Sequence, residues 1–142
     1  MPLCQGTNNG SRPALMKLLV VDDHPIVRSA LRRLLAGRAM DIREAASGPE
    51  ALDAFREFGP DLVLMDLNLP GMSGFEVIRR LKTENAHARI LVLSMHDSPR
   101  SMSRALHAGA GGYITKDAPP DRILAALDAL ARGPAYQEER VT

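Results

Sequence analysis

The stretch KLLVVDDHPIVRSALRRLL, residues 17–35, predicts a buried strand that leads directly into an amphipathic helix. Residues 18–21 are four consecutive apolar side chains, which is typical of a central strand with helices on both of its faces. From Ile26 onward, apolar residues recur at helical spacing, with arginines on the opposite side. A buried strand followed at once by such a helix indicates an α/β fold built on a parallel sheet.

The same unit recurs along the chain. Residues 62–65 and 90–93 are two further runs of four apolar residues, as expected for central strands. Residues 40–45 alternate apolar with charged side chains and are typical of an edge strand, whereas residues 112–115 form a short strand that begins with glycine. Together with the amphipathic stretches between them, these runs predict five strand and helix units in a doubly wound parallel sheet with strand order 2-1-3-4-5.

Capping residues predict where some helices begin and end. Ser47 and Glu50 have the spacing of a capping box, and the proline between them suits the first helical turn. Another helix is predicted to begin near Ser98 and to stop at Gly109. These helices are therefore delimited by local signals as well as by their periodicity.

Length and composition allow one domain. The chain has 142 residues, of which 45% are hydrophobic, enough for one buried core but not for two. We expect a disordered leader at residues 1–15, where turn-forming residues outnumber core residues. The folded domain is predicted at residues 16–132, and residues 133–142 are expected to be the start of a linker or a tail.

Charge and cysteine content exclude several classes of protein. The 18 basic and 17 acidic side chains leave a net charge of +1, so overall charge gives no reason to expect attraction to nucleic acid or to a membrane. The single cysteine, Cys4, excludes an internal disulfide framework. No apolar run approaches the roughly 20 residues that a membrane span needs, and the leader lacks the features of a signal peptide. We therefore expect a soluble, cytoplasmic protein.

Polar residues follow the predicted strands at their carboxyl ends, where functional side chains gather in such sheets. They are Asp22 and Asp23 after the first strand, Asp66 after the third, Ser94 at the end of the fourth, and Lys116 after the fifth. With strands one, three and four side by side, the three carboxylates should converge at one rim of the sheet. At an effective dielectric constant of about 20, two like charges about 4 Å apart repel by about 4 kcal/mol, so a cation should compensate them.

The expected convergence indicates a divalent-cation site with a nucleophilic carboxylate. Oxygen ligands suit Mg²⁺, or Mn²⁺ in its place, and Lys116 adds a second positive charge. Once these cations neutralise the pocket, Asp66 can attack a phosphoryl group and form an aspartyl phosphate. Lys116 and Ser94 are then expected to bind phosphoryl oxygens. Main-chain groups of Leu67 and Asn68 would complete the oxygen shell.

Four motifs carry a family resemblance: LLVVDDHP at 18–25, LVLMDLNLPGMSG at 62–74, LVLSMHD at 91–97 and AGAGGYITKDA at 108–118. With them, residues 17–132 resemble the receiver domain of bacterial two-component response regulators, which implies a flavodoxin-like fold of five βα units. The resemblance also implies a role for each site residue: Asp66 as phosphoacceptor, Asp22 and Asp23 with Asp66 as metal ligands, Asn68 as a metal ligand through its backbone carbonyl, Lys116 and Ser94 as partners of the phosphoryl group, and Tyr113 as a switch residue that turns inward when the Ser94 hydroxyl moves toward that group.

One position departs from the family pattern. Many receivers have proline, in a cis peptide, directly after the lysine, whereas Asp117 follows Lys116 here. Because cis bonds are rare without proline, this difference argues against a cis peptide at this place.

The DDHP opening and the AGAGGYITKDA block are most similar to the response regulators whose receivers precede a helix-turn-helix DNA-binding domain. The resemblance implies that Asp66 takes a phosphoryl group from the phosphohistidine of a sensor histidine kinase with Mg²⁺ bound, and that the new charge shifts a two-state equilibrium. It also implies control of transcription through a DNA-binding domain outside this chain, which ends before a recognition helix could form. We expect the chain to be either a part of a longer regulator or a receiver that acts alone.

Two other functions and two contact faces stay open. A Mg²⁺-dependent phosphohydrolase would use Asp66 as a turnover nucleophile, but it needs a general acid about two residues later, and that position is Asn68. A pseudo-receiver would bind partners without phosphorylation. Two copies can pair through the predicted first and fifth helices, or through the fourth helix, the fifth strand and the fifth helix.

Several residues also have simpler roles available to them. Asp22 can cap the first helix, and Tyr113 can be a half-buried strand aromatic. The histidines lack the spacing of a zinc site, so surface or packing roles are expected for His24, His87, His96 and His107. The arginines of the first helix are expected to form a solvated face rather than a nucleic-acid-binding patch, because no aromatic residues are interleaved with them.

Overall fold

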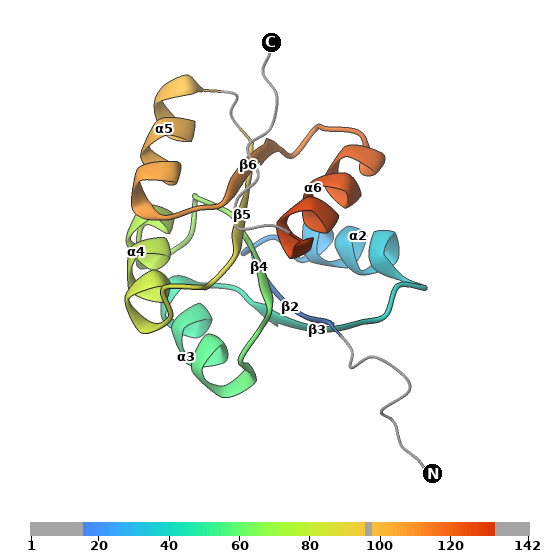
Figure 1. Cartoon of the computed structure of the whole chain (residues 1–142), viewed down its shortest axis with the longest axis horizontal. Helices are drawn as coiled ribbons and strands as arrows, with labels where there is room; N and C mark the ends of the chain where they lie inside the picture. Colours follow the sequence, from blue (N-terminus) through green and yellow to red (C-terminus); the bar gives the residue numbers. More distant parts are fainter. Residues whose placement is uncertain (1–15, 96–97, 133–142) are drawn as a thin grey trace.

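The computed structural model describes residues 16–95 and 98–132, in which strands and helices alternate along the chain (Figure 1). The strands are β2 (Met16–Val21), β3 (Met40–Ala45), β4 (Leu62–Met65), β5 (Ile90–Ser94) and β6 (Gly112–Thr115). The helices are α2 (Pro25–Leu35), α3 (Gly48–Phe58), α4 (Gly74–Glu84), α5 (Pro99–Ala108) and α6 (Pro120–Arg132). Among the described residues, none of the helices combines the length and the apolar character needed to cross a bilayer. The expected leader and the expected linker or tail lie outside the described residues.

The sheet is parallel, with its strands in the order β3-β2-β4-β5-β6. Along the chain this is the order 2-1-3-4-5, so the predicted doubly wound topology is confirmed. The edge position predicted for residues 40–45 is confirmed as well, because β3 lies at one end of the sheet. Figure 1 shows α3, α4 and α5 on one face of the sheet and α2 and α6 on the other.

The alternation of side chains along the strands divides the core into two layers. In β2, Leu19 and Val21 pack in the layer under α3, α4 and α5, whereas Leu18 and Val20 pack in the layer under α2 and α6. Each of these four side chains is at most 2% exposed. Since successive side chains of a strand point to opposite faces, a strand covered on both faces requires such an uninterrupted apolar run.

Helix ends predicted from capping residues are confirmed. The Ser47 side chain accepts a hydrogen bond from Glu50 N–H, which satisfies a donor that helix formation leaves unpaired. The Glu50 side chain accepts a hydrogen bond from Ala46 N–H, one residue before the Ser47 N–H that a capping box would use. Ser98 caps α5, and this helix ends at Gly109, where φ is 122°. A positive φ of this kind favours glycine, because a Cβ atom would strain the backbone.

Backbone hydrogen bonds continue the sheet one residue past three of its strands. Asp22 N–H donates to a carbonyl of β3 at 3.0 Å, and Asp66 N–H donates to one of β2 at 2.9 Å. Lys116 N–H donates to a carbonyl of β5 at 2.7 Å. The polar residues that follow these strands are thus held by the sheet, and they lie at the same rim because the strands are parallel.

Gly74, the first residue of α4, packs directly on the backbone that follows β4. A Cβ atom there would lie 2.6 Å from Leu67 Cα and 3.0 Å from the carbonyl oxygen of Asp66. We expect Gly74→Ala to lower the free energy of unfolding by about 1–3 kcal/mol, because the backbone has to move to admit the methyl group. Urea unfolding followed by circular dichroism measures this loss.

Gly59→Ala is the control for this prediction. Gly59 has a φ of 61°, and no atom lies within 4 Å of the position that a Cβ would occupy, so alanine there adds backbone strain alone, about 1 kcal/mol. Because Gly74 touches the segment that carries Asp66, we expect Gly74→Ala, and not Gly59→Ala, also to weaken Mg²⁺ binding. Unchanged Mg²⁺ affinity in Gly74→Ala would show that the pocket does not depend on this close approach.

Candidate functional site

Two buried carboxylates and a lysine meet at the rim of the sheet. Asp22 and Asp66 are 2% and 1% exposed. Lys116 Nζ lies 2.7 Å from Asp22 Oδ2 and 3.2 Å from Asp66 Oδ2, and the Lys116 side chain is itself 8% exposed. Lys116 offsets the charge of one carboxylate and leaves the three groups with an excess negative charge, which is costly to bury.

The pocket perturbs the ionisation of Asp66 and Lys116. Burial raises the pKa of the Asp66 carboxyl, and the charge of Asp22 adds to this; the Asn68 N–H, 3.1 Å from Oδ1, and the charge of Lys116 oppose the rise without cancelling it. Burial lowers the pKa of Lys116, but its hydrogen bonds and charge interactions with the two acids outweigh burial, so that the pKa is raised overall. Lys116 therefore stays protonated at neutral pH. The Asp66 carboxylate is a stronger base than that of an ordinary aspartate.

Asp22 shapes the turn between β2 and α2. Its Oδ1 accepts a hydrogen bond from His24 N–H at 2.9 Å, and its carbonyl oxygen accepts one from Arg28 Nη1 at 2.6 Å. The N-cap residue of α2 is His24, and no side-chain hydrogen bond caps this helix. The simpler role considered for Asp22, that of a cap for this helix, is therefore wrong: its carboxylate binds Lys116 and the turn instead.

The arginines of α2 do not all form the expected solvated face. Arg28 and Arg32 both donate to the carboxylate of Glu44 on β3, Arg28 through Nε at 2.8 Å, and the Arg28 side chain is 18% exposed. The hydrogen bond from Arg32 is the main reason why the pKa of Glu44 is lowered. Since Arg28 also binds the carbonyl of Asp22, it ties the acidic turn to the edge strand of the sheet.

Asp23 extends the acidic pocket toward α2. One ligand atom from each of four residues lies within 4.8 Å of the other three: Asp22, Asp23, His24 and Asp66. Asp23 Oδ1 is buried and has no hydrogen-bond partner among the described residues; His24 Nδ1 is 3.1 Å away, but this contact is not aligned as a hydrogen bond. Burying a carboxylate oxygen in this way is costly unless a cation binds it. The donor set of Asp22, Asp23 and Asp66 therefore fits a divalent metal ion.

His24 was missed as a residue of this pocket. Its Nδ1 lies 2.9 Å from Asp22 Oδ1, and its side chain is 58% exposed, so the expected surface role describes its exposure but not its contacts. The signal that was available is its position directly after two acids, at a turn from strand to helix. The spacings of zinc motifs do not identify His24, because they describe ligands close together in the sequence. The acids around His24 include Asp66, which is distant in the chain.

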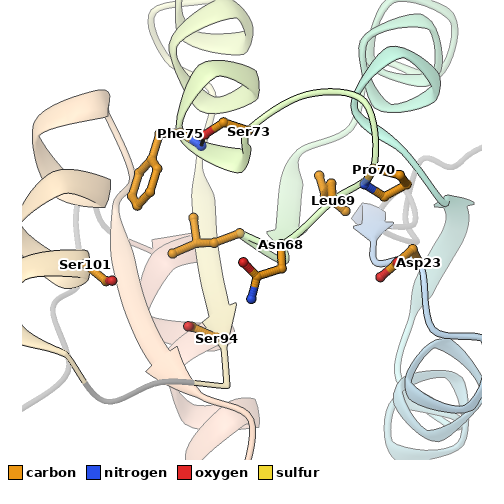
Figure 2. Close-up of a pocket in the computed structure, with 9 residues that line it drawn as sticks. Asp23, Asn68, Leu69, Pro70, Ser73, Phe75, Ser94 and Ser101 are labelled. Carbon is orange, nitrogen blue, oxygen red and sulfur yellow. Dashed lines mark hydrogen bonds between the residues drawn. The ribbon is translucent and has the colours of Figure 1, made fainter.

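An open cavity of about 520 Å³ lies beside the acids (Figure 2). Asp23, Asn68 and Ser94 line it, and Asn68 is seen between the other two in Figure 2. Ser94 ends β5 and is 2% exposed. On the side of α4 and α5 the lining includes Phe75 and Ser101. The cavity therefore has room for a phosphoryl-sized group beside Asp23 and Ser94, whereas Asp22, Asp66 and Lys116 are not among its lining residues.

The other predicted site residues lie beside this pocket or behind it. Asn68 is exposed, and its N–H donates to Asp66; the role of its carbonyl as a metal ligand stays a prediction. Tyr113 is 2% exposed and packs in the layer under α3, α4 and α5, so it is fully buried rather than half-buried. No peptide bond among the described residues is cis, including the one between Lys116 and Asp117.

Comparisons with known proteins point to one family. The model of the response regulator receiver domain matches residues 18–128. The chain is 41% identical over 126 residues to the transcriptional activator protein ExaE of Pseudomonas putida, covering 87% of this chain and 59% of that protein. It is 36% identical over 128 residues to the nitrate/nitrite response regulator protein NarL of Escherichia coli strain K12, covering 88% of this chain and 59% of NarL. The chain thus spans less than two thirds of the length of these relatives.

Solved structures show the same relationship. A two-component response regulator of the LuxR family from Aurantimonas sp. SI85-9A1 superposes with a TM-score of 0.83 at 38% identity, over 89% of this chain and 91% of that chain. The signal receiver domain of a NarL response regulator from Mycobacterium tuberculosis superposes with a TM-score of 0.80 at 32% identity, over 85% of this chain and 99% of that chain. The flavodoxin-like fold that the resemblance implied is confirmed.

Proposed function

The chain belongs to the response regulator receiver domain family, and from this we propose that Asp66 is the phosphoacceptor of a two-component system. Receivers of this family are signalling proteins, and this one is of the type found in LuxR and NarL response regulators. The proposed donor is the phosphohistidine of a sensor histidine kinase, in a reaction that requires Mg²⁺ or Mn²⁺.

One arrangement carries the proposal: Lys116 Nζ contacts Asp66 and Asp22 at once, beside an open cavity. Lys116 offsets part of the negative charge that would otherwise repel an incoming phosphoryl group. Burial raises the pKa of Asp66, and greater basicity favours attack by a carboxylate oxygen. The Asn68 N–H and Lys116 Nζ hold the two oxygens of Asp66 in a defined orientation, as an in-line displacement requires.

In the proposed step, an oxygen of Asp66 forms a bond to phosphorus while the bond from phosphorus to the kinase histidine nitrogen breaks. The electron pair of the broken bond stays on that nitrogen, so a ring protonated on its other nitrogen leaves as neutral imidazole. A divalent ion held by Asp22, Asp23 and Asp66 would supply positive charge at the phosphoryl oxygens. Lys116 pairs with one of these oxygens, and the Ser94 hydroxyl donates a hydrogen bond to another. The product is an aspartyl phosphate.

The new charge is proposed to shift the balance between two conformations of the domain. Ser94 ends β5 and lies opposite Thr115 of β6 in the sheet, so a movement of Ser94 toward the phosphoryl group acts directly on β6. Tyr113 lies on the same strand and is the proposed switch residue. The output surface proposed from this is formed by α5, β6 and α6.

A second contact surface is proposed where α2 meets α6. A cavity of about 290 Å³ there is lined mainly by apolar residues of the two helices, and one of them, Ile26, is 81% exposed. Exposed apolar surface of this kind is typical of contact sites. It supports pairing of two copies through α2 and α6; the surface formed by α5, β6 and α6 is the other candidate.

The proposed output is transcription. ExaE is described as a transcriptional activator and NarL as a response regulator, and the chain covers 59% of each. We propose that this receiver controls a DNA-binding domain in a longer cytoplasmic regulator. A receiver that acts alone stays the alternative.

Mass spectrometry of the intact protein tests the proposal. After incubation with Mg²⁺ and acetyl phosphate, we expect about one phosphoryl group per chain, because Asp66 is the proposed acceptor. Asp66→Asn should abolish the added mass. Asp53→Asn is the matched control, since the Asp53 side chain is 73% exposed on α3, and it should be phosphorylated like the wild type. No added mass on the wild type would indicate a pseudo-receiver, and repeated turnover of phosphate esters would indicate a phosphohydrolase.

A further inference from the structure

We propose that His24 makes the acidic pocket a mixed nitrogen and oxygen site, in which the ring strengthens the binding of a first-row transition ion such as Co²⁺, Ni²⁺ or Zn²⁺ but adds little to the binding of Mg²⁺. The proposal concerns the same acids as the phosphoacceptor role, but it does not depend on phosphorylation. It names His24 Nδ1 as a metal ligand in addition to the carboxylates of Asp22, Asp23 and Asp66.

The distances around His24 Nδ1 carry the proposal. This atom lies 2.9 Å from Asp22 Oδ1 and 3.1 Å from Asp23 Oδ1. Ligands about 2.1 Å from an octahedral ion are about 3.0 Å from their neighbours and about 4.2 Å from the ligand opposite. The ligand atoms of the four residues all lie within 4.8 Å of one another. Small side-chain movements would therefore bring them around one ion.

The turn holds the ring over the acids. His24 N–H donates to Asp22 Oδ1, and Arg28 binds the carbonyl of Asp22. Pro25 begins α2, and its ring restricts the backbone at the start of the helix. The His24 side chain makes no capping hydrogen bond, although this residue is the N-cap of α2. Its Nδ1 instead faces the two acids, and its 58% exposed side chain leaves the pocket open to ions from solvent.

The buried oxygen of Asp23 is an independent indication of a cation at this place. Asp23 Oδ1 has no hydrogen-bond partner among the described residues, even though His24 Nδ1 is 3.1 Å away. A ring that served only as a hydrogen-bond donor to the acids would satisfy Asp22 and leave this oxygen unpaired. An ion between the ring nitrogen and the carboxylates would bind both.

The chemistry of the ligands determines which metal ions gain from the His24 ring. Mg²⁺ prefers oxygen ligands and keeps several waters, so an imidazole adds little to its binding. Imidazole suits Zn²⁺, Ni²⁺ and Cu²⁺, and affinities for a given site rise from Mn²⁺ through Co²⁺ and Ni²⁺ to Cu²⁺. A histidine next to three carboxylates should therefore strengthen binding of transition ions selectively.

Calorimetric titration of the whole chain with Co²⁺ and, separately, with Mg²⁺ tests the proposal without any phosphoryl donor. His24→Gln keeps a polar side chain but removes the ring. We expect it to weaken Co²⁺ binding at least about tenfold and to change Mg²⁺ binding less than about threefold. His107→Gln, at an exposed position near the end of α5, is the matched control and should leave both affinities unchanged.

Nitrogen NMR of the wild type gives a second readout that needs no variant. Titration with diamagnetic Zn²⁺ should shift the Nδ1 resonance of His24 by the amount typical of metal coordination, and the other histidines should shift less. Equal Co²⁺ affinity in His24→Gln and wild type, or an equal loss for Co²⁺ and Mg²⁺, would refute the preference. An unshifted Nδ1 would refute coordination even if the variant failed to fold. Failure of phosphorylation alone would affect only the proposed function.

Discussion

Lys116→Met is expected to destabilise the fold by about 3–5 kcal/mol at neutral pH, the usual result of removing one partner from a buried ion pair. Methionine keeps much of the lysine stem but leaves the carboxylates of Asp22 and Asp66 without a cation. Lys116 Nζ lies 2.7 Å and 3.2 Å from their oxygens, and all three side chains are at most 8% exposed. Urea unfolding with circular dichroism measures the loss.

The pH dependence of this loss has a definite sign. In the wild type the pKa of Lys116 is raised above its ordinary value of 10.5, so the lysine contributes its full stabilisation below that value and loses it as the pH rises through the folded-state pKa. In the variant, a proton on Asp66 relieves its repulsion with the charge of Asp22, so the folded state gains this proton more readily than the unfolded state. The stability difference from the wild type should therefore shrink as the pH falls from about 7 to about 4.

Lys17→Met is the matched control for this experiment. Lys17 is exposed on β2 and contacts the carbonyl and the ring of Phe58. Its replacement should cost about 0.5 kcal/mol or less, as is usual at the surface. Mg²⁺ should restore part of the stability lost in Lys116→Met, because a bound cation stabilises the folded state by mass action. A loss below about 1 kcal/mol would show that the two acids are not charged together in the folded protein.

Asp66→Asn is expected to stabilise the metal-free fold at neutral pH while abolishing phosphorylation, because a carboxyl pKa that is raised in the folded state makes the charged form a net cost of folding. Burial raises the pKa of Asp66 despite Lys116 and the Asn68 N–H, which means that the folded state holds this carboxylate at a cost. Asparagine has nearly the same shape without the charge. Lys116 keeps its partner Asp22 in the variant, at 2.7 Å.

The sign of the pH dependence again follows from the direction of the pKa shift. A carboxyl group whose folded-state pKa is raised imposes no penalty below its unfolded-state pKa, near 3.8 for Asp66, and its full penalty above the folded-state value. The advantage of Asp66→Asn should therefore be small in acid and grow as the pH rises to neutrality. Denaturant unfolding over this range, in chelator, measures it. A variant less stable than the wild type at neutral pH would mean that the pairing with Lys116 outweighs burial.

Local sequence determined most of the architecture. Four-residue apolar runs marked the central strands, and Ser47 and Gly109 marked a helix start and a helix end that the structure contains. These features depend on the chemistry of neighbouring residues alone, because periodicity and capping act over a few positions. The order of strands in a parallel sheet then brought Asp22, Asp66 and Lys116 to one rim, since every strand ends at the same edge.

Tertiary structure alone decided which side chains touch. The sequence placed His24 directly after two acids but did not fix the direction of its ring, which turns back onto Asp22 and Asp23. Nor did it show that Arg28 binds both Glu44 and the carbonyl of Asp22, or that Tyr113 is fully buried. Each of these contacts depends on side-chain rotamers, and most of them also on distances between elements far apart in the chain. Rotamers and such distances are set when the two core layers pack, because a side chain takes the position that its neighbours in space leave open.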